Sequence, residues 1–246
     1  TRRTFHAYAL NEARLYEDRV SQDLGARVFA DVFPQLADAL RRDDLDARTH
    51  TVGYGQFTRQ QFTPDYLEEV REAALVMLYR LLFLFYAEDR HLLPVHDPRY
   101  APYSVRRIRE EVRDKVDAGA SFSSTMPRIW LALRGVFGLI NKGDDDIGMP
   151  AYNGGLFNRA RAPLLERTDV PDKVMAPIID ALSRRTEDLL RGWINYRDLA
   201  VAHLGSIYER LLEYSLVHRV QAQDDYKDKA EVDRIEATPS SFARKV

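Results

Sequence analysis

Cysteine is absent from the 246 residues of the chain. This absence excludes disulfide bonds, thiol catalysis and every metal site built on cysteine, and it fits a reducing cytoplasm. Long apolar runs are also missing, since none approaches the roughly 18 residues that a membrane-spanning helix needs. We therefore expect a cytoplasmic protein with no membrane partner.

An excess of charge of either sign is lacking as well. The chain has 36 basic and 38 acidic residues and a net charge of −2. Without an overall basic field, we do not expect a free-standing domain that binds DNA strongly. A basic patch on one face of the protein is still compatible with this composition. The chain begins with Thr-Arg-Arg instead of Met and shows no signal-peptide core. We expect it to be a fragment of a longer polypeptide.

The common catalytic motifs are not found either. There is no Gly-x-Ser-x-Gly elbow of a hydrolase and no phosphate-binding glycine-rich loop with its lysine. Gly53 and Gly55 begin like a dinucleotide loop, but Thr58 stands where the third glycine is needed. Asp225 and Lys227 form the Asp-x-Lys triplet of a magnesium-dependent nuclease, without a convincing upstream carboxylate. A degenerate nuclease is therefore a minor alternative.

Two groups of polar residues could be considered as metal sites. Residues 144–146 are three consecutive aspartates, which point in different directions, so a solvated turn is favoured over a calcium loop. His91, His96 and Asp97 lie close in sequence, but Pro94 breaks the helix between them. A hydrogen-bonding role for these residues is favoured over metal ligation.

Helical spacing of apolar residues dominates what is present. The longest helix is expected over about 65–91, with Thr63 as its N-cap, Pro64 in its first turn and Pro94 after its end. At about 40 Å it should be the central helix. Further helices are expected over 7–40 (kinked or split by Pro34), 103–118, 125–141, 171–191 and 200–222.

The expected fold class is therefore all-α, an irregular multi-helix bundle around the long central helix. At most a short β-hairpin is expected near residues 49–62, which are rich in Thr, Gly and aromatic residues. Residues 1–222 should form one helical domain, with a sub-boundary open near 45–62. Residues 223–246 are polar without a clear period, so we expect a linker that leads to a domain outside this chain.

The first of three notable motifs covers residues 80–94, where an apolar run ends in Tyr86, Ala87, Glu88, Asp89 and Arg90 before a proline. The apolar part must be buried on nearly all sides. Charges at the rim of a buried helix are costly unless they are paired. We expect these three charged residues to pin the central helix to a neighbour.

The second motif covers residues 149–157, and the third covers residues 199–214. In the second, Asn153, Gly154 and Gly155 predict a tight turn with positive φ, which Tyr152 and Phe157 would anchor onto helices. The third predicts a helix with one apolar face. It includes Gly205, Tyr208 and Glu209, and Gly205 should let another backbone come close.

In this order and spacing, the three motifs resemble the helical region ahead of the methyltransferase domain in large adenine-specific DNA methyltransferases. That family includes fused type IIG restriction-modification enzymes and the methylases of phage-defence systems such as BREX and DISARM. Its pattern is an apolar helix ending in Tyr-Ala-Glu-Asp-Arg, then Tyr-Asn-Gly-Gly-Leu-Phe, then Leu-Gly-Ser-Ile-Tyr-Glu. The resemblance covers roughly residues 60–245.

The resemblance implies a connector that positions the methyltransferase and target-recognition domains on double-stranded DNA, in a parent enzyme that uses S-adenosylmethionine. The family's catalytic loop is Asn/Asp-Pro-Pro-Tyr/Phe, which holds a flipped adenine. The nearest match, Met-Pro-Ala-Tyr at 149–152, lacks the Asn/Asp and the second proline, and a glycine-rich cofactor loop is missing. No catalytic, cofactor-binding or metal-binding residue is therefore assigned. The main alternative is a non-enzymatic adaptor that binds other subunits of a defence system.

Five arginines are candidates for contacts with DNA phosphates. They are Arg106, Arg107 and Arg109 in one expected helix and Arg184 and Arg185 in another. Because acidic residues are interspersed among them, the favoured interpretation is an exposed helix with ion pairs between successive turns. A face that binds phosphates is the second interpretation.

Overall fold

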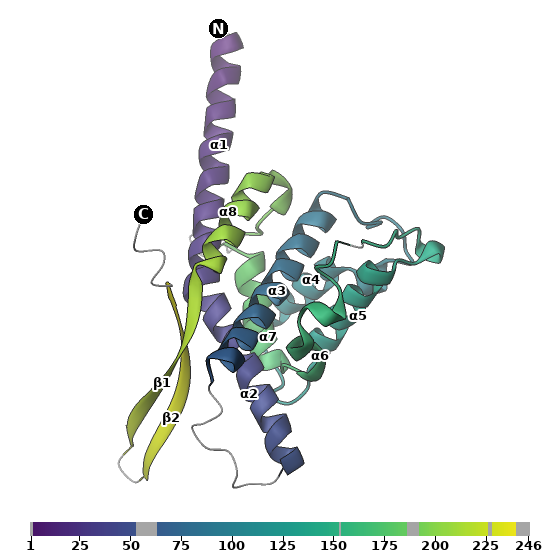
Figure 1. Ribbon diagram of the computed structural model, residues 1–246. Coiled ribbons are helices and arrows are strands. Elements are labelled where there is room, and N and C mark those ends of the chain that lie inside the picture. Colours follow the sequence, from purple (N-terminus) through teal and green to yellow (C-terminus); the bar gives the residue numbers. More distant parts are fainter. Residues whose placement is uncertain (1, 53–62, 153, 186–191, 226–227, 240–246) are drawn as a thin grey trace.

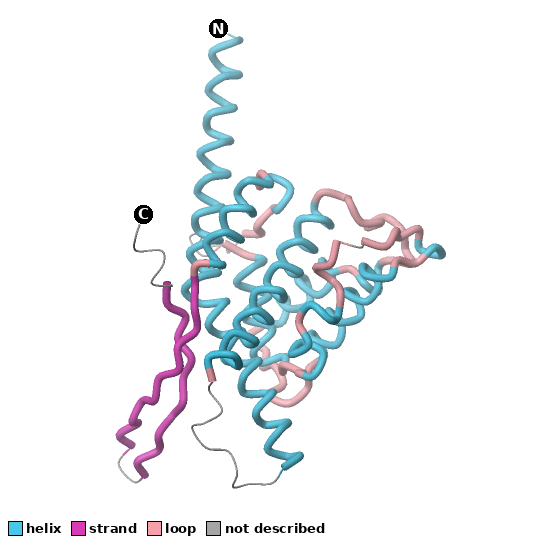
Figure 2. Tube along the Cα trace, in the orientation of Figure 1, coloured by secondary structure: helices cyan, strands magenta, loops and turns pink. Residues whose placement is uncertain are grey.

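The computed structural model describes residues 2–52, 63–152, 154–185, 192–225 and 228–239 (Figure 1). It is predominantly helical, as Figure 2 shows, and its strands form a two-stranded antiparallel hairpin. The expected all-α class with a short hairpin is thus confirmed. Among the helices described, none is both long enough and apolar enough to cross a membrane.

A long, segmented rod opens the chain. Helix α1 (Arg2–Arg27) runs into a π-helical turn η1 (Val28–Val32), which continues into α2 (Phe33–Val52). Pro34 cannot donate to the carbonyl four residues earlier, and its ring crowds that carbonyl, so the regular helical pattern cannot pass through this point. The α-helical pattern is accordingly interrupted just ahead of Pro34 by a π-helical turn, and the chain stays helical on both sides of it. The first half of α1 projects away from the body in Figure 1.

Helix α3 (Pro64–Asp89) is the central helix of the bundle. Its expected bounds are confirmed to within two residues, and the Thr63 hydroxyl accepts a hydrogen bond from the Tyr66 N–H at 3.2 Å, as an N-cap does. Its apolar run is buried, and α3 contacts α2 and other helices on several sides (Figure 1). The core of the protein is therefore built around this helix.

Shorter helices complete the bundle. They are α4 (Val105–Asp117), α5 (Arg128–Lys142), α6 (Pro163–Arg167), α7 (Asp172–Ser183) and α8 (Val201–Leu212), with 3-10 turns η3 (Ala101–Tyr103), η4 (Asp145–Ile147), η5 (Arg159–Arg161) and η6 (Tyr196–Asp198). Helix α7 packs against α2, α4 and α5, whereas α8 packs against α1 and α3. The helix expected over 171–191 ends at Ser183, and residues 186–191 lie outside the described part.

The hairpin is not where the sequence predicts it. Residues 49–52 belong to α2, and 53–62 lie outside the described residues. Strands β1 (Tyr214–Asp225) and β2 (Asp228–Pro239) pair instead. The expected helix over 200–222 is thus wrong beyond Leu212, and much of the segment expected to be a polar linker from residue 223 belongs to this hairpin. At its base the hairpin joins the core, since Tyr214 stacks on Phe29 with ring centroids 5.2 Å apart.

Gly143 ends α5 in a conformation that only glycine adopts freely. Its φ is +72°, and an added Cβ would lie 2.6 Å from the nitrogen of Ala151 and 2.8 Å from the oxygen of Met149. We expect Gly143→Ala to lower the free energy of unfolding by about 2–3 kcal/mol, measured by urea denaturation. Gly138→Ala is the control, because its Cβ would meet no atom within 4 Å. Equal stability of the two variants would contradict this steric account.

Candidate functional site

Glu88, at the last turn of α3, binds the start of α4. Its carboxylate accepts hydrogen bonds from the Tyr100 hydroxyl (2.8 Å), the Ser104 hydroxyl (3.2 Å) and the backbone N–H groups of Val105 (2.7 Å) and Arg106 (2.8 Å). The first N–H groups of a helix have no partner inside it, and they favour a negative charge nearby. Burial raises the pKa of Glu88, and these four hydrogen bonds oppose the rise.

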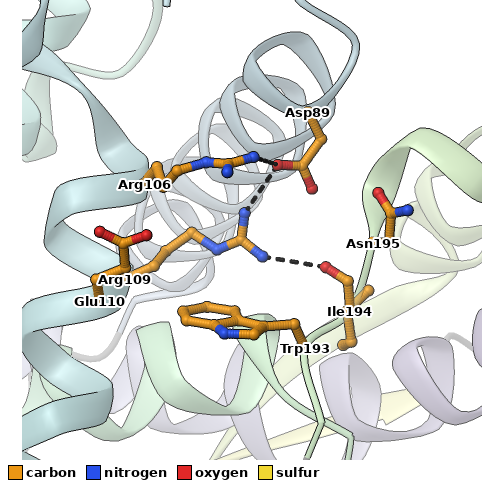
Figure 3. Close-up of a pocket in the computed structure, with 7 residues that line it drawn as sticks. All are labelled: Asp89, Arg106, Arg109, Glu110, Trp193, Ile194 and Asn195. Carbon is orange, nitrogen blue, oxygen red and sulfur yellow. Dashed lines mark hydrogen bonds and ion pairs between the residues drawn. The ribbon is translucent and has the colours of Figure 1, made fainter.

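Asp89 joins α3 to two further segments. Figure 3 shows the guanidinium groups of Arg106 and Arg109 pointing at one of its oxygens, at 3.2 Å and 3.4 Å. The other oxygen accepts a hydrogen bond from the backbone N–H of Tyr196 at 3.0 Å. The expectation that the charged end of this helix is pinned to a neighbour is therefore confirmed for Glu88, through four neutral donors, and for Asp89, through two arginines.

Arg109 is the centre of the network, and only 3% of it is exposed. It donates to the Ser183 hydroxyl and to the Ile194 carbonyl, both at 3.1 Å. Three rings surround its guanidinium, with centroids at 4.6–5.5 Å, namely those of Phe85, Trp193 and Tyr196. A planar cation between aromatic faces gains from their negative π clouds as well as from its hydrogen bonds.

A cavity of about 310 Å³ opens beside this network (Figure 3). It is lined by Asp89, Arg106, Arg109, Glu110, Trp193, Ile194 and Asn195. Its polar groups are the carboxylate of Asp89, whose two oxygens already have partners, and the guanidinium of Arg106. The indole ring of Trp193 forms an apolar part of the wall. This arrangement suits holding the end of α3, the start of α4 and residues 193–196 together.

The five arginines that are candidates for DNA contacts differ in their exposure to solvent. Arg109 and Arg184 are each 3% exposed, and Arg184 is paired with Asp180 at 2.6 Å, so the expectation that these two face solvent is wrong. Arg106 and Arg107 are both exposed, and Arg106 also pairs with Asp89. Arg185 is half-buried and donates to a tyrosine hydroxyl of α1 at 3.0 Å.

Arg90 behaves differently from the two acids before it. It is exposed, donates one long hydrogen bond (3.4 Å) to the Leu199 carbonyl, and lies over the half-buried ring of Tyr86 at 5.3 Å. A pinning role for Arg90 through a buried ion pair is therefore wrong. We expect Arg90→Ala to change the free energy of unfolding by less than about 1 kcal/mol in urea denaturation. A loss of 3 kcal/mol or more would show that Arg90 shares in the buried network.

The second motif packs against α3. The Tyr152 hydroxyl donates to the Leu92 carbonyl at 2.9 Å, and the Phe157 ring packs edge-on against Phe83 at 5.4 Å. Gly155 has a φ of +78°, which confirms the expected turn at this residue. Gly154 does not have a positive φ, and Asn153 lies outside the described residues.

Arg80 holds this turn in place, a role that was not predicted from the sequence. Its guanidinium, 2% exposed, donates to the carbonyls of Leu156 (2.9 Å) and Asn158 (3.0 Å). Burial lowers the pKa of Arg80 to about 10, which a nearby carboxylate opposes. An arginine inside an otherwise apolar helical run is the sequence signal that could have indicated this residue.

The third motif meets α3 through tyrosines. The Tyr79 hydroxyl donates to the Tyr208 carbonyl at 3.1 Å, and the two rings lie 4.4 Å apart. Burial is the main cause that raises the pKa of Tyr79 to about 12. The expected close approach of a backbone at Gly205 is wrong, since a Cβ there would meet no atom within 4 Å. Glu209 is exposed on α8.

The weak metal candidates have other contacts. Asp144 caps η4 by accepting from the N–H groups of Asp146 and Ile147, as a turn residue does. The rings of His91 and His96 stack with centroids 4.9 Å apart. Within the described ranges, no three His, Cys, Asp or Glu side chains are arranged to hold a metal ion.

Comparison of the chain with models of known protein families, with curated proteins and with solved structures finds no match. The functional argument therefore depends on the chain's own motifs and on the contacts between them. Those contacts bring all three motifs to α3.

Proposed function

We propose that this chain is a helical connector of a cytoplasmic adenine-specific DNA methyltransferase that acts in restriction-modification or phage defence. The connector would hold the catalytic and target-recognition domains in a fixed arrangement on double-stranded DNA. One observation supports this best: the three motifs that carry the family resemblance, far apart in sequence, meet around α3.

The contacts between the motifs are specific ones. Side chains of α3 or of the second motif donate to main-chain carbonyls elsewhere, as Arg80 does to Leu156, Tyr79 to Tyr208 and Tyr152 to Leu92, all at 2.9–3.1 Å. Hydrogen bonds from buried or half-buried side chains to a backbone fix its position, because an unpaired carbonyl would be costly there. Contacts of this kind make the bundle rigid, and rigidity is what a connector must provide.

The chemistry of methyl transfer belongs, in this proposal, to other parts of the parent protein. S-adenosylmethionine would supply the methyl group for the adenine amino nitrogen. This chain has neither the Asn/Asp-Pro-Pro-Tyr/Phe loop nor a glycine-rich cofactor loop, so none of its residues is assigned to the cofactor or to the base. Arg106 and Arg107 remain the candidates for backbone phosphates on the exposed side of α4.

The test uses the native polypeptide that carries this chain. Duplex DNA would be incubated with the purified protein and S-adenosylmethionine, and its nucleosides analysed by mass spectrometry for N6-methyladenine. We expect methylation that requires the cofactor. Absence of methylated adenine across DNA of varied sequence would contradict the proposal.

One observation favours the adaptor as a second candidate. The outer part of α1 exposes large apolar side chains, with Tyr8 63%, Leu10 54% and Leu15 47% exposed. Several large apolar side chains exposed along one projecting helix can contribute to a surface that binds another protein. If the native protein transfers no methyl group but elutes with other defence subunits, and Leu15→Glu disrupts that association, the adaptor is the better description.

A further inference from the structure

A small cavity of about 100 Å³ is lined by residues of α3, α5, α6 and the segment around η5. Four of its lining side chains are cations and one is a carboxylate. The lining comprises Arg80, Arg134, Phe137, Gly138, Asn141, Lys142, Phe157, Arg159 and Glu166. This excess of positive charge is local, because the whole chain is nearly neutral.

The feature that singles out this cavity is Arg80, a buried cation without a paired anion. Its hydrogen bonds go to two neutral carbonyls, and its guanidinium faces the rings of Phe137 and Phe157 at 5.1 Å and 5.9 Å. Among the residues that the structure describes, none forms an ion pair with Arg80 within salt-bridge distance, although the carboxylate of Glu166 opposes the fall in its pKa from a greater distance. A buried charge left unpaired is expensive, so the site favours an incoming anion.

The rim of the cavity adds further donors. Lys142 is exposed at the last turn of α5, and Arg159 is exposed and 3.4 Å from Glu166. The Nε of Arg134 is buried without a hydrogen-bond partner in the described part of the chain. The Nη2 atom of Arg134 forms an ion pair with Asp169 at 2.8 Å. Guanidinium groups suit tetrahedral oxyanions because their N–H groups match two oxygens at once.

We propose that this cavity binds a phosphate group, as inorganic phosphate, a phosphate ester or a phosphate of a nucleic-acid backbone. The buried Arg80 would hold the phosphate from inside the protein, and the exposed Lys142 and Arg159 would hold it from the solvent side. Its residues are separate from the arginines of α4 that are candidates for DNA contacts. The site therefore stands independently of the connector function.

The test measures binding of inorganic phosphate to the full chain by isothermal titration calorimetry at constant ionic strength. We expect saturable binding that Lys142→Ala weakens about fivefold or more, because a charge-assisted donor is lost. Glu166→Gln should strengthen it, because the carboxylate that the described lining contains is neutralised. Lys173→Ala, an exposed lysine on α7, is the matched control and should leave affinity unchanged.

These surface substitutions leave Arg80 and its structural hydrogen bonds intact, so a change in binding is separable from misfolding. Circular dichroism of each variant checks this. Absence of saturable phosphate binding in the unchanged protein would overturn the proposal. Equal affinities for Lys142→Ala, Glu166→Gln and Lys173→Ala would overturn it as well.

A second arm distinguishes the source of the phosphate. Fluorescence anisotropy would follow a labelled 20-base-pair duplex while inorganic phosphate is added against a matched chloride control. Displacement by phosphate that is lost in Lys142→Ala identifies the nucleic-acid backbone as the source. Phosphate binding without displacement of DNA identifies a free phosphate or a small phosphate ester, and either result supports the site.

Discussion

Replacing Glu88 with alanine is expected to lower the free energy of unfolding by about 3 kcal/mol or more. Its carboxylate accepts four hydrogen bonds, and two of the donors, the Tyr100 hydroxyl and the Val105 N–H, are fully buried. Each buried donor left without a partner costs about 1–3 kcal/mol. The start of α4 also loses the negative charge that stabilises it. Urea denaturation followed by circular dichroism measures the change.

Glu110→Ala is the matched control, because Glu110 is an exposed glutamate in α4, and its effect should stay within about 0.5 kcal/mol. If the two alanine variants are equally stable, the capping role assigned to Glu88 is wrong. The stability of Glu88→Gln should lie between that of Glu88→Ala and that of the unchanged protein. An amide keeps one acceptor oxygen, but its NH₂ group turns a donor toward the N–H groups of α4.

The pH dependence gives a further check on the same residue. Because burial raises the pKa of Glu88 above 4.5 in the folded state, the folded protein binds this proton more tightly than the unfolded chain does. The stability that this group contributes is therefore fully present below pH 4.5 and is lost as the pH rises through the folded-state pKa. Glu88→Gln should remove this part of the slope. An unchanged slope in that variant would contradict a raised pKa.

The central helix could be predicted from sequence because its signals are local. The cap at Thr63, the proline in the first turn and the long apolar run all act within a few residues, and the structure confirms them. The hairpin at residues 214–239 could not be recognised in the same way. Its strands pair residues that are distant in sequence, such as Tyr214 with Pro239, so its signal is not local.

The candidate site shows the same division between local and distant signals. That Glu88 and Asp89 need partners follows from charges beside a buried run, but the partner of Asp89 at Tyr196 lies 107 residues away. Arg109 was grouped with exposed arginines because of its charge. Its spacing of four from Val105 and three from Val112 places it on the buried face of α4, and this apolar spacing was the signal that could have indicated it.

Removing Arg109 should destabilise the protein by about 3–5 kcal/mol, because Arg109→Ala leaves Asp89 buried with a weaker set of partners. The same change deprives the Ile194 carbonyl of a donor and empties the space between three aromatic rings. Arg107→Ala, an exposed arginine two residues earlier, should change stability by less than about 0.5 kcal/mol. Urea denaturation of both variants makes the comparison.

A double-mutant cycle then separates the ion pair from the rest of the network. Asp89→Ala and Arg109→Ala should together cost less than the sum of the single changes, by about 1 kcal/mol or more, because each single change leaves a buried charge that the double variant removes. Arg109→Lys should not restore full stability, since one ammonium group cannot reach Asp89, Ser183 and Ile194 in three directions. Strict additivity of the single changes would mean that Arg109 acts through packing between the rings, and that its pairing with Asp89 adds no stability of its own.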